Sequence, residues 1–369
     1  MFGIVVMRMT TLSTDEIRIF VLGELLVRKM QKRPTLKDVA AYSQVSIISA
    51  SRALRGLENV SPELRAKVEA AADALGYSRN PIAGSLRGQS SDLVVVLVPA
   101  MTNNVFPAVV DGIYAGLSQT GLGVVLGLTG YGIESEERVL RNMLAWSPAG
   151  LVLSGSEHTD DTEAMLAEFD GPIVEVMDID GETERSQVGL SHLEAGRMMA
   201  DHFLKCGYRR IGYIGAWGEQ PLRSRKRRIS FEEELRRNGV ELVGRFIHPD
   251  PSSVSVGAES FDRLIEEHSD LEAIFFANDD LALGAMSNAL DRGLSIPDDM
   301  AFAGFNGLDV CDVVRPHLTT IVTPRFEVGC LAGKIIADTF RTGENKGPQQ
   351  RRELALELRQ GGTTRLRNA

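Results

Sequence analysis

From residue 91 onward, short apolar runs alternate with longer stretches in which apolar residues recur at helical spacing. Short runs rich in β-branched residues are typical of strands, and amphipathic stretches are typical of the helices that cover them. The pattern predicts strands at 93–98, 124–128, 151–154, 173–177, 211–215, 273–277, 300–305 and 318–322. It predicts helices at 106–120, 134–145, 192–205, 226–238, 258–268, 280–292 and 326–341. This alternation indicates an α/β fold with parallel, doubly wound sheets covered on both faces.

The predicted strands are too many for one compact sheet of this kind, so we divide them into two sheets. The first is expected to end near residue 190 and the second near residue 322. Two such sheets side by side leave a cleft that is lined by the loops at the carboxyl ends of their strands. Open α/β sheets bind small ligands at such a cleft.

Residues 35–76 have a different pattern, with three short apolar faces separated by polar turns. Thr35 is a suitable N-cap for a first helix, "SQV" turns the chain, and Ser46 can cap a second helix. Pro62 begins a third helix and Gly76 ends it. A helix-turn-helix unit of this kind places its second helix in the major groove of DNA. A plain three-helix bundle with its isoleucines in the core is the alternative that the spacing leaves open.

The distribution of charge supports the DNA-binding interpretation. The chain of 369 residues has a net charge of −10, which by itself discourages nucleic-acid binding. Residues 30–90 nevertheless carry nine basic and five acidic groups, a net charge of +4, so the acidity lies in the remainder. A basic head on an acidic body predicts a polyanion-binding module joined to a second function.

The remaining composition argues against several classes of protein. No apolar stretch reaches the ~18 residues that a membrane helix needs. Cys206, Cys311 and Cys330 lie far apart, which fits reduced thiols in a cytoplasmic protein better than disulfides or a zinc site. The six histidines form no metal spacing and no nucleophile–base pair. The run "GLGVVLG" (121–127) precedes a strand, whereas a dinucleotide loop follows one. We therefore predict no catalytic residue, no metal and no cofactor.

The first 29 residues fit neither the basic head nor the α/β body. They have little positive charge ahead of their apolar run and no clear cleavage site, so a secretory signal is not expected. Residues 15–30 could form a helix. Alternatively the protein starts at Met30, and the upstream residues are a mis-assigned start or a loose tail.

The stretch "RPTLKDVAAYSQVSIISASRALRGLENVSPELRAKVEAAADALGYSRNPIAGSLRG" (33–88) resembles the DNA-binding head of the lactose-repressor (LacI) family along its whole length. The resemblance implies base contacts by Ile47 and Ile48, whose apolar side chains can contact thymine methyl groups but cannot form bidentate hydrogen bonds. It implies a base or phosphate contact by Arg52. Phosphate contacts, which position the protein without reading sequence, are implied for Thr35, Ser46 and Ser51.

The segment "NPIAGSLRG" (80–88) resembles the hinge helix of the same family. It is too short to be stable alone, so it is expected to become ordered on DNA. Leu86 matches the leucine that wedges into the minor groove and bends the duplex, with Asn80 and Ala83 as further contacts. Gly84 departs from the family and weakens the hinge helix by about 0.5–1 kcal/mol relative to alanine. A simple flexible linker is the alternative.

The resemblance continues through the α/β body. "ANDDLALGAM", "IPDDMAFAGFNG" and "LTTIVTPR" match the family core, and residues 103–159 are most similar to its gluconate-utilisation repressors. That core is similar to a two-lobed, sugar-binding periplasmic protein, which implies that residues from about 323 to 350 return to the first lobe. Effector contacts are implied for Asn103, Phe106, Ser154, His158, Asp178, Arg227, Asn278 and Asn306.

Two of these residues suggest the class of effector. Asn306 stands where many relatives have an aspartate, and the loss of that anion favours a negatively charged ligand. Arg227 could then hold a carboxylate through two hydrogen bonds, as in gluconate or a keto-gluconate. Asp178 would bind ligand hydroxyls. The alternatives are that Asp178 caps a helix, that His158 is an exposed loop residue, and that Ser230 in place of the usual glycine shifts the register of Arg227.

The run "RSRKRR" (223–228) has two interpretations. It could be a second DNA-binding patch. The solvated start of a helix, from which Arg227 alone turns inward, is the interpretation that we favour.

Together these observations predict a cytoplasmic, nucleoid-associated transcription regulator, a repressor that binds double-stranded operator DNA as a homodimer and responds to a small effector. The tail "TTRLRNA" is too short for a further oligomerisation helix, which favours dimers. A sugar-binding transport protein and an NAD-dependent sugar-acid enzyme are the alternatives. The expected domains are an extension (1–33), the helix-turn-helix head (34–79), the hinge (80–90) and the core (91–369), with lobe 1 at 91–190 and 323–350 and lobe 2 at 191–322 and 351–369.

Overall fold

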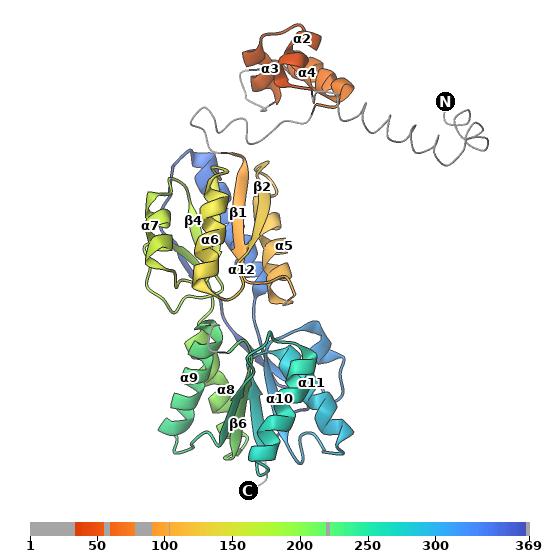
Figure 1. The fold of residues 1–369 in the computed structure, drawn as a ribbon, viewed down its shortest axis with the longest axis vertical. Coiled ribbons are helices and arrows are strands. Elements are labelled where there is room, and N and C mark those ends of the chain that lie inside the picture. Colours follow the sequence, from red (N-terminus) through yellow and green to blue (C-terminus); the bar gives the residue numbers. More distant parts are fainter. Residues whose placement is uncertain (1–33, 55–59, 78–90, 103, 219–221, 367–369) are drawn as a thin grey trace, which may run out of the picture. The chain divides into compact units, whose positions relative to one another are not determined.

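The computed structural model describes residues 34–54, 60–77, 91–102, 104–218 and 222–366. The chain divides into two compact units, residues 1–80 and 81–369 (Figure 1). The expected extension at 1–33 and the expected hinge at 80–90 lie outside the described residues. No helix in the described ranges is long and apolar enough to cross a membrane.

The described part of the first unit is a bundle of three short helices, α2 (Leu36–Tyr42), α3 (Ile47–Leu54) and α4 (Pro62–Leu75), each of which contacts the other two. The Ser61 hydroxyl accepts a hydrogen bond from the Leu64 amide and caps α4, and Gly76, at φ 63°, ends it. Small side chains fill the core, which lets the helices approach closely; they are Val39, Ala40, Ala50, Ala53, Val60, Val68, Ala71 and Ala72. The predicted helix-turn-helix is confirmed.

The first lobe of the second unit is built on a six-stranded parallel sheet in the order β11-β5-β4-β3-β1-β2. Its strands are β1 (Leu93–Val98), β2 (Gly123–Leu128), β3 (Gly150–Ser154), β4 (Ile173–Val176), β5 (Ser186–Gly189) and β11 (Arg351–Glu353). Its helices are α5 (Val105–Leu117), α6 (Ile133–Leu144), α7 (Asp160–Glu168) and α12 (Arg325–Thr342).

Alternate side chains of β1 serve two different cores of this lobe. Val94 and Val96 pack in a cluster that includes residues of α5 and α12, whereas Val95 and Leu97 pack in a second cluster with residues of α6 and α7. A strand buried on both faces needs an unbroken apolar run, because successive side chains point to opposite sides. The "LVVVLV" sequence of β1 meets that requirement.

The second lobe repeats this plan with the strand order β12-β10-β9-β8-β6-β7, parallel except for the antiparallel edge strand β12. Its strands are β6 (Ile211–Gly215), β7 (Gly244–Ile247), β8 (Ala273–Phe276), β9 (Ala301–Asn306), β10 (Thr319–Val322) and β12 (Glu357–Arg359). Its helices are α8 (His192–Lys205), α9 (Leu222–Arg237), α10 (Val254–Glu267), α11 (Asp279–Asp291) and the short 3₁₀ helix η3 (Asp309–Asp312).

The chain crosses between the lobes three times, after β5, after β10 and after β11. The return segment stays in the first lobe through Glu353, because β11 pairs with β5, and this is three residues beyond the expected boundary at 350. The loops after β1, β2, β4, β6, β8 and β9 meet at one cleft. The two-sheet fold with a cleft between the lobes is therefore confirmed.

Helices α5 and α12 pack against each other through glycines. A Cβ atom at Gly329 of α12 would lie 2.0 Å from the Val109 carbonyl oxygen of α5, and one at Gly112 of α5 would lie 2.1 Å from the Phe326 carbonyl oxygen of α12. No real Cβ atom tolerates such distances, so only glycine permits this approach of the two backbones.

The variant Gly329→Ala is expected to lower the free energy of unfolding by about 1–3 kcal/mol, the typical cost of overpacking a close interface. Urea denaturation of the full chain measures the loss. Lys334→Ala, at an exposed position of the same helix, is the control and should change stability little. A Gly329→Ala protein as stable as the wild type would contradict the assigned packing.

Candidate functional site

The turn between α2 and α3 presents the start of α3 to solvent. Ser46 caps α3, because its hydroxyl accepts a hydrogen bond from the Ser49 amide at 3.0 Å. Ile47 and Ile48 follow, with exposed fractions of 45% and 62%, and Arg52 is exposed one turn later. The plain-bundle alternative, with both isoleucines in the core, is therefore wrong.

The other predicted DNA contacts are paired within the head, partly buried, or outside the described residues. The Thr35 side chain is exposed, and its hydroxyl donates to the Asp38 carboxylate, as does its backbone amide, both at 2.7 Å. Ser51 is half-buried on α3. Asn80, Ala83 and Leu86 lie outside the described residues.

A cleft with about 590 Å³ of space, open solvent included, lies between the two lobes of the second unit. Its described walls include two arginines and no acidic residue. From the first lobe come Val105, Phe106, Tyr131 and Met177, and from the second lobe His192, Ala216, Trp217, Arg223, Ser224, Arg227, Ala277, Asn278, Phe305 and Asn306. The Tyr131 and Trp217 rings, 4.4 Å apart between centroids, meet across the cleft.

Arg227 is the most constrained charge in the cleft. Its side chain is buried, with Nη1 2.8 Å from His192 Nδ1 and Nη2 donating to the Ala277 carbonyl at 2.9 Å. The guanidinium lies 3.8 Å from the centre of the Phe305 ring. Among the described residues no carboxylate pairs with it, and its Nε–H has no acceptor. Burial of this uncompensated charge lowers the pKa of Arg227 to about 10.

His192, at the first position of α8, determines how Arg227 is held. Its Nε2 lies 2.8 Å from the Met177 carbonyl oxygen and must donate there, so Nδ1 is the acceptor for Arg227. Burial, together with the positive charges of Arg227 and Arg223, lowers the pKa of His192 well below 6.5. The imidazole is therefore neutral at physiological pH. No pattern in the sequence predicted this role of His192.

Helix α9 carries further cations to the first lobe. Arg223 Nη1 donates to the Ser154 hydroxyl at 2.8 Å, and its guanidinium lies over the Phe106 ring. Lys226 Nζ forms an ion pair with Asp178 Oδ2 at 2.7 Å and a second, closer one with Glu157. The interpretation that Arg227 alone turns inward needs correction, since Lys226 contacts the opposite lobe and Arg228 is also buried. The helix also starts at Leu222, four residues before the predicted position.

The carboxylate of Asp178 has partners on both oxygens. Oδ1 accepts from the Asp180 amide at 2.8 Å and Oδ2 accepts from Lys226, and the side chain is fully buried. Asp180, rather than Asp178, accepts from the first amides of α8. Asp178 is therefore a partner of Lys226 in this structure and does not line the cleft.

Two predicted asparagines do line the cleft. The Asn278 side chain caps α11 through Oδ1 and donates through Nδ2 to the Ser252 hydroxyl at 2.7 Å. Asn306 ends β9 with φ at 120°, a strained conformation for a residue other than glycine. Asn103 lies outside the described residues.

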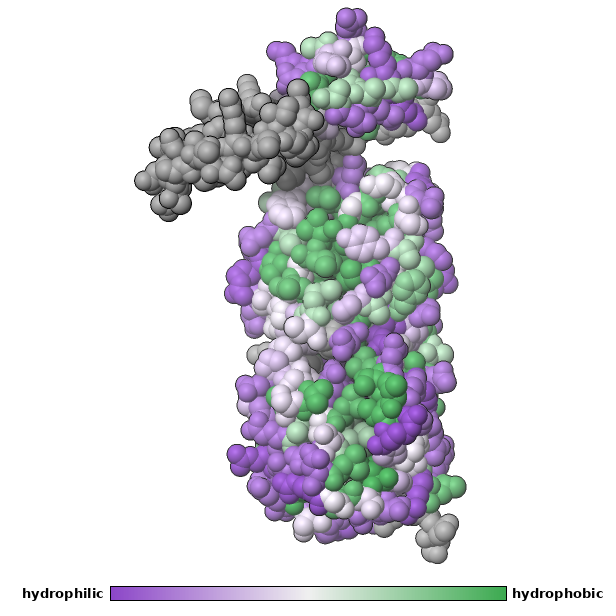
Figure 2. Space-filling model, turned by 90° about the vertical axis from the view of Figure 1, so that its right-hand side faces the viewer, coloured by the Kyte–Doolittle hydropathy of each residue, from purple (hydrophilic) through white to green (hydrophobic). Residues whose placement is uncertain are grey.

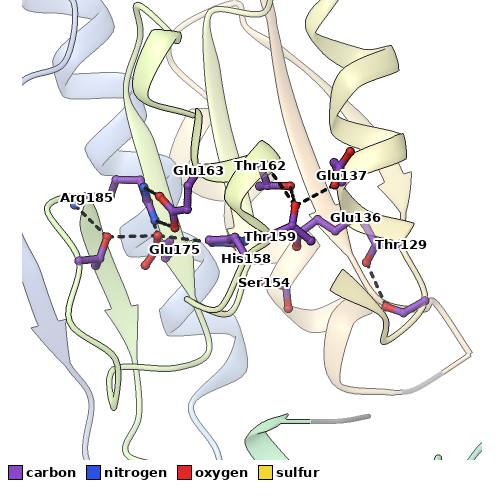
Figure 3. A network of polar contacts seen from close by, with 12 residues as sticks. Thr129, Glu136, Glu137, Ser154, His158, Thr159, Thr162, Glu163, Glu175 and Arg185 are labelled. Atoms are coloured by element: carbon purple, nitrogen blue, oxygen red, sulfur yellow. Dashed lines mark hydrogen bonds and ion pairs between the residues drawn. The ribbon is translucent and has the colours of Figure 1, made fainter. Parts of the chain in front are cut away.

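His158 lies inside the first lobe, in a row of charged groups (Figure 3). Its side chain has no exposed surface, and Nδ1 donates to Glu136 Oε1 at 2.5 Å, while Nε2 is 3.6 Å from Glu175 Oε1. Arg185 continues the row, because it pairs with both Glu175 and Glu163. The alternative of a solvent-exposed loop histidine is therefore wrong. The predicted effector contact would be indirect, because His158 lines neither the cleft nor the cavity beside it, whereas its partner Glu136 lines that second cavity.

Burial opposes the charged form of His158, but the Glu136 and Glu175 carboxylates outweigh it and raise its pKa from 6.5 to about 9. The imidazolium is thus part of the folded structure at neutral pH. In the described part of the chain, no group of three or more His, Cys, Asp or Glu side chains is arranged to hold a metal ion.

Known proteins share both parts of this architecture. Residues 35–80 match the bacterial regulatory proteins of the lacI family, and residues 200–364 match the periplasmic binding protein-like domain. The chain is 40% identical over 317 residues to the HTH-type transcriptional regulator GntR of Pseudomonas aeruginosa, covering 83% of this chain and 92% of that protein.

Solved structures agree. A transcriptional regulator of the LacI family from Silicibacter pomeroyi has a TM-score of 0.83 at 39% identity, over 89% of this chain and 99% of that one. The lac repressor dimer bound to operator and an anti-inducer has a TM-score of 0.74 at 26% identity, over 90% of this chain and 100% of that one.

The raised pKa of His158 predicts a pH-dependent contribution to stability. A group whose pKa is higher in the folded state stabilises that state fully below its unfolded value and loses the effect as pH rises through its folded value. The wild type should therefore be more stable than His158→Gln at pH 6. This difference between their free energies of unfolding is expected to fall by on the order of 3 kcal/mol between pH 6 and pH 9.5.

Urea denaturation at several pH values measures this difference. His317→Gln, at an exposed histidine, is the matched control and should leave the pH profile of stability unchanged. If the wild type and His158→Gln keep a constant stability difference across the range, the imidazolium is not held as described.

Proposed function

Because this chain belongs to the lacI family of bacterial regulatory proteins, we propose that it is a repressor whose operator binding is controlled by a sugar acid held between its lobes. It is a DNA-binding transcriptional regulator and not an enzyme. The proposal concerns the effector, the DNA contacts and the assembly.

The observation that carries the effector is the buried Arg227 guanidinium. It has no carboxylate partner in the described part of the chain, and its Nε–H has no acceptor. A buried cation without a counter-charge is costly, and a ligand carboxylate both neutralises it and accepts the remaining hydrogen bond. The described walls of the cleft, which include no acidic residue, fit the same ligand. Gluconate or a keto-gluconate is the effector that we propose.

The remaining cleft residues suit a small hydroxylated ligand. The Phe106, Trp217 and Phe305 side chains provide apolar surface, and Ser224 and Asn306 provide polar groups. Ligand sites typically combine such apolar walls with a few placed polar groups. Of the predicted contacts, Phe106, Arg227, Asn278 and Asn306 line the cleft, Ser154 reaches it through Arg223, and Asp178 acts through Lys226.

For the operator, we propose that α3 enters the major groove. The exposed Ile47 and Ile48 would contact thymine methyl groups, Arg52 a base edge or phosphate, and Thr35, Ser46 and Ser51 phosphates. Leu86, outside the described residues, is proposed as the minor-groove wedge, with Asn80 and Ala83 beside it. Such a regulator works in the cytoplasm, and its association with the nucleoid follows from operator binding.

A homodimer is the proposed assembly, since a two-fold protein matches two operator half-sites. The lac repressor structure is a dimer on its operator. Apolar surface also gathers over both lobes on the face shown in Figure 2, as expected of a surface that another subunit covers. Effector and operator binding are then coupled reciprocally: if the effector weakens operator binding, the operator weakens effector binding by the same factor.

The effector assignment predicts that Arg227→Ala abolishes the response to gluconate and keto-gluconate while operator binding persists. Calorimetric titration of the full chain measures effector affinity, and a gel shift with the upstream promoter measures operator release. Arg225→Ala, on the same helix but exposed, is the matched control and should respond normally. A normal response of Arg227→Ala would overturn the proposed site.

The operator assignment predicts that Arg52→Ala weakens binding to the cognate operator by about 1–3 kcal/mol if the guanidinium makes a bidentate base contact. Affinities for operator and for random DNA, compared at one salt concentration, measure it. Lys67→Ala, an exposed cation on α4, is the control. An equal loss on random DNA would show that Arg52 contacts phosphate instead.

A further inference from the structure

A second cavity adjoins the effector cleft and has no assigned occupant. It has about 440 Å³ of space, open solvent included, at the carboxyl ends of β1, β2 and β3. Tyr131 and Arg223 line both cavities, so the two cavities are neighbours. In the first lobe, the strand order changes direction between β1 and β3, and open α/β sheets bind ligands at such a point.

The two cavities differ in charge. The effector cleft has Arg223 and Arg227 and no described acid, whereas the second cavity has the carboxylates of Glu136 and Glu157. Glu157 pairs with Lys226, which also neutralises Asp178, so one cation serves two anions there. Glu136 belongs to the row with His158, Glu175, Arg185 and Glu163, which has three carboxylates and two cations.

Glu136 is built as a fixed hydrogen-bond acceptor. It lies in the first turn of α6, is 7% exposed, and lines the second cavity. Its Oε1 accepts from His158, and no other partner of Glu136 is seen among the described residues, so Oε2 remains for an occupant of the cavity. His158 acts as a positioning residue, because its contact with Glu136 Oε1 fixes the orientation of the Glu136 carboxylate in the cavity (Figure 3).

We propose that one effector molecule spans both cavities, with its carboxylate at Arg227 and its far hydroxyl groups donating to Glu136. This rests on the proposed function and narrows its ligand class to aldonic acids, which carry a single anionic group at one end. A second carboxylate or a phosphate at the far end of the ligand would face the Glu136 carboxylate. Both groups only accept hydrogen bonds, so neither could donate one to the other. The repulsion excludes aldaric acids and phosphorylated aldonic acids.

Titration of the full chain with gluconate, glucarate, 6-phosphogluconate and glucitol tests the proposal. Gluconate is expected to bind, and glucarate and 6-phosphogluconate are expected to bind at least about tenfold more weakly, the effect of one unpaired charged contact. Glucitol, without an anion for Arg227, should bind most weakly of the four.

The decisive variant is Glu136→Gln, which removes the charge but keeps the shape. This variant should lower the affinity for gluconate by about tenfold. It should also reduce the preference for gluconate over glucarate to about threefold or less. Glu134→Gln, an equal charge change at an exposed position of the same turn, should keep wild-type affinities and preference. His158→Gln should lower the preference as well, a change that a purely structural role would not produce.

The outcomes separate the two proposals. If gluconate binds and depends on Arg227 but Glu136→Gln keeps the full preference over glucarate, the spanning mode is overturned and the proposed function stands. If the wild type binds gluconate and glucarate equally well, the spanning mode is likewise overturned and the proposed function stands. If no sugar acid binds, the proposed effector and the spanning mode are both overturned.

Discussion

A guanidinium that is buried without a carboxylate partner in the described part of the chain is the constraint on which the cleft depends. Arg227 is held by a neutral imidazole, a backbone carbonyl and the face of an aromatic ring, none of which cancels its charge. The neutral state of His192 is part of this arrangement, since an imidazolium could not accept from Arg227 and would add a second buried cation. The site therefore stores unsatisfied positive potential that an anion can relieve.

The same helix that carries Arg227 also joins the lobes. Lys226 and Arg227 lie three and four positions after Arg223, so both fall on the same side of α9 as Arg223. Arg223 reaches Ser154 and Lys226 reaches Asp178 and Glu157, all in the first lobe. The proposed effector contact and the lobe–lobe contacts are thus made by neighbouring side chains, which is a physical basis for coupling between a ligand and the arrangement of the lobes.

Strong apolar periodicity made most of the fold predictable. β1 has the predicted bounds, because its buried run contains no polar residue, and α8 has the predicted bounds as well. The strands β5, β11 and β12 were missed because "SQVG", "RRE" and "ELR" have little apolar content, and their pairing depends on distant strands. β7 ("GRFI") was missed as well, and α7 because its first turn is acidic and polar.

The site was less predictable than the fold, for a different reason. His192, Lys226 and Glu136 act through partners 35, 48 and 22 residues away in the chain, and a sequence pattern does not reveal such contacts. Family resemblance directed attention to Arg227 and Asp178, but it could not show that a lysine occupies the Asp178 carboxylate. In the run 223–228, Arg223 and Lys226 contact the first lobe, Arg225 is exposed to solvent, and Arg227 and Arg228 are buried, an arrangement that only the packing of α9 decides.

The pairing of Asp178 with Lys226 has a consequence for regulation. This contact joins the two lobes directly, since Asp178 lies in the first lobe and Lys226 in the second. An effector shifts the equilibrium between two lobe arrangements only if it binds one of them more tightly than the other. A contact with Arg227 alone would not distinguish them. The proposed effector therefore favours the arrangement in which the first lobe also brings Phe106 and Tyr131 to the ligand. A ligand that filled the second-lobe half of the cleft alone would bind without signalling. Under the proposed function, signalling therefore requires contacts from both lobes, and in the first lobe the loops after β1, β2 and β3 line the cavities where such contacts would form.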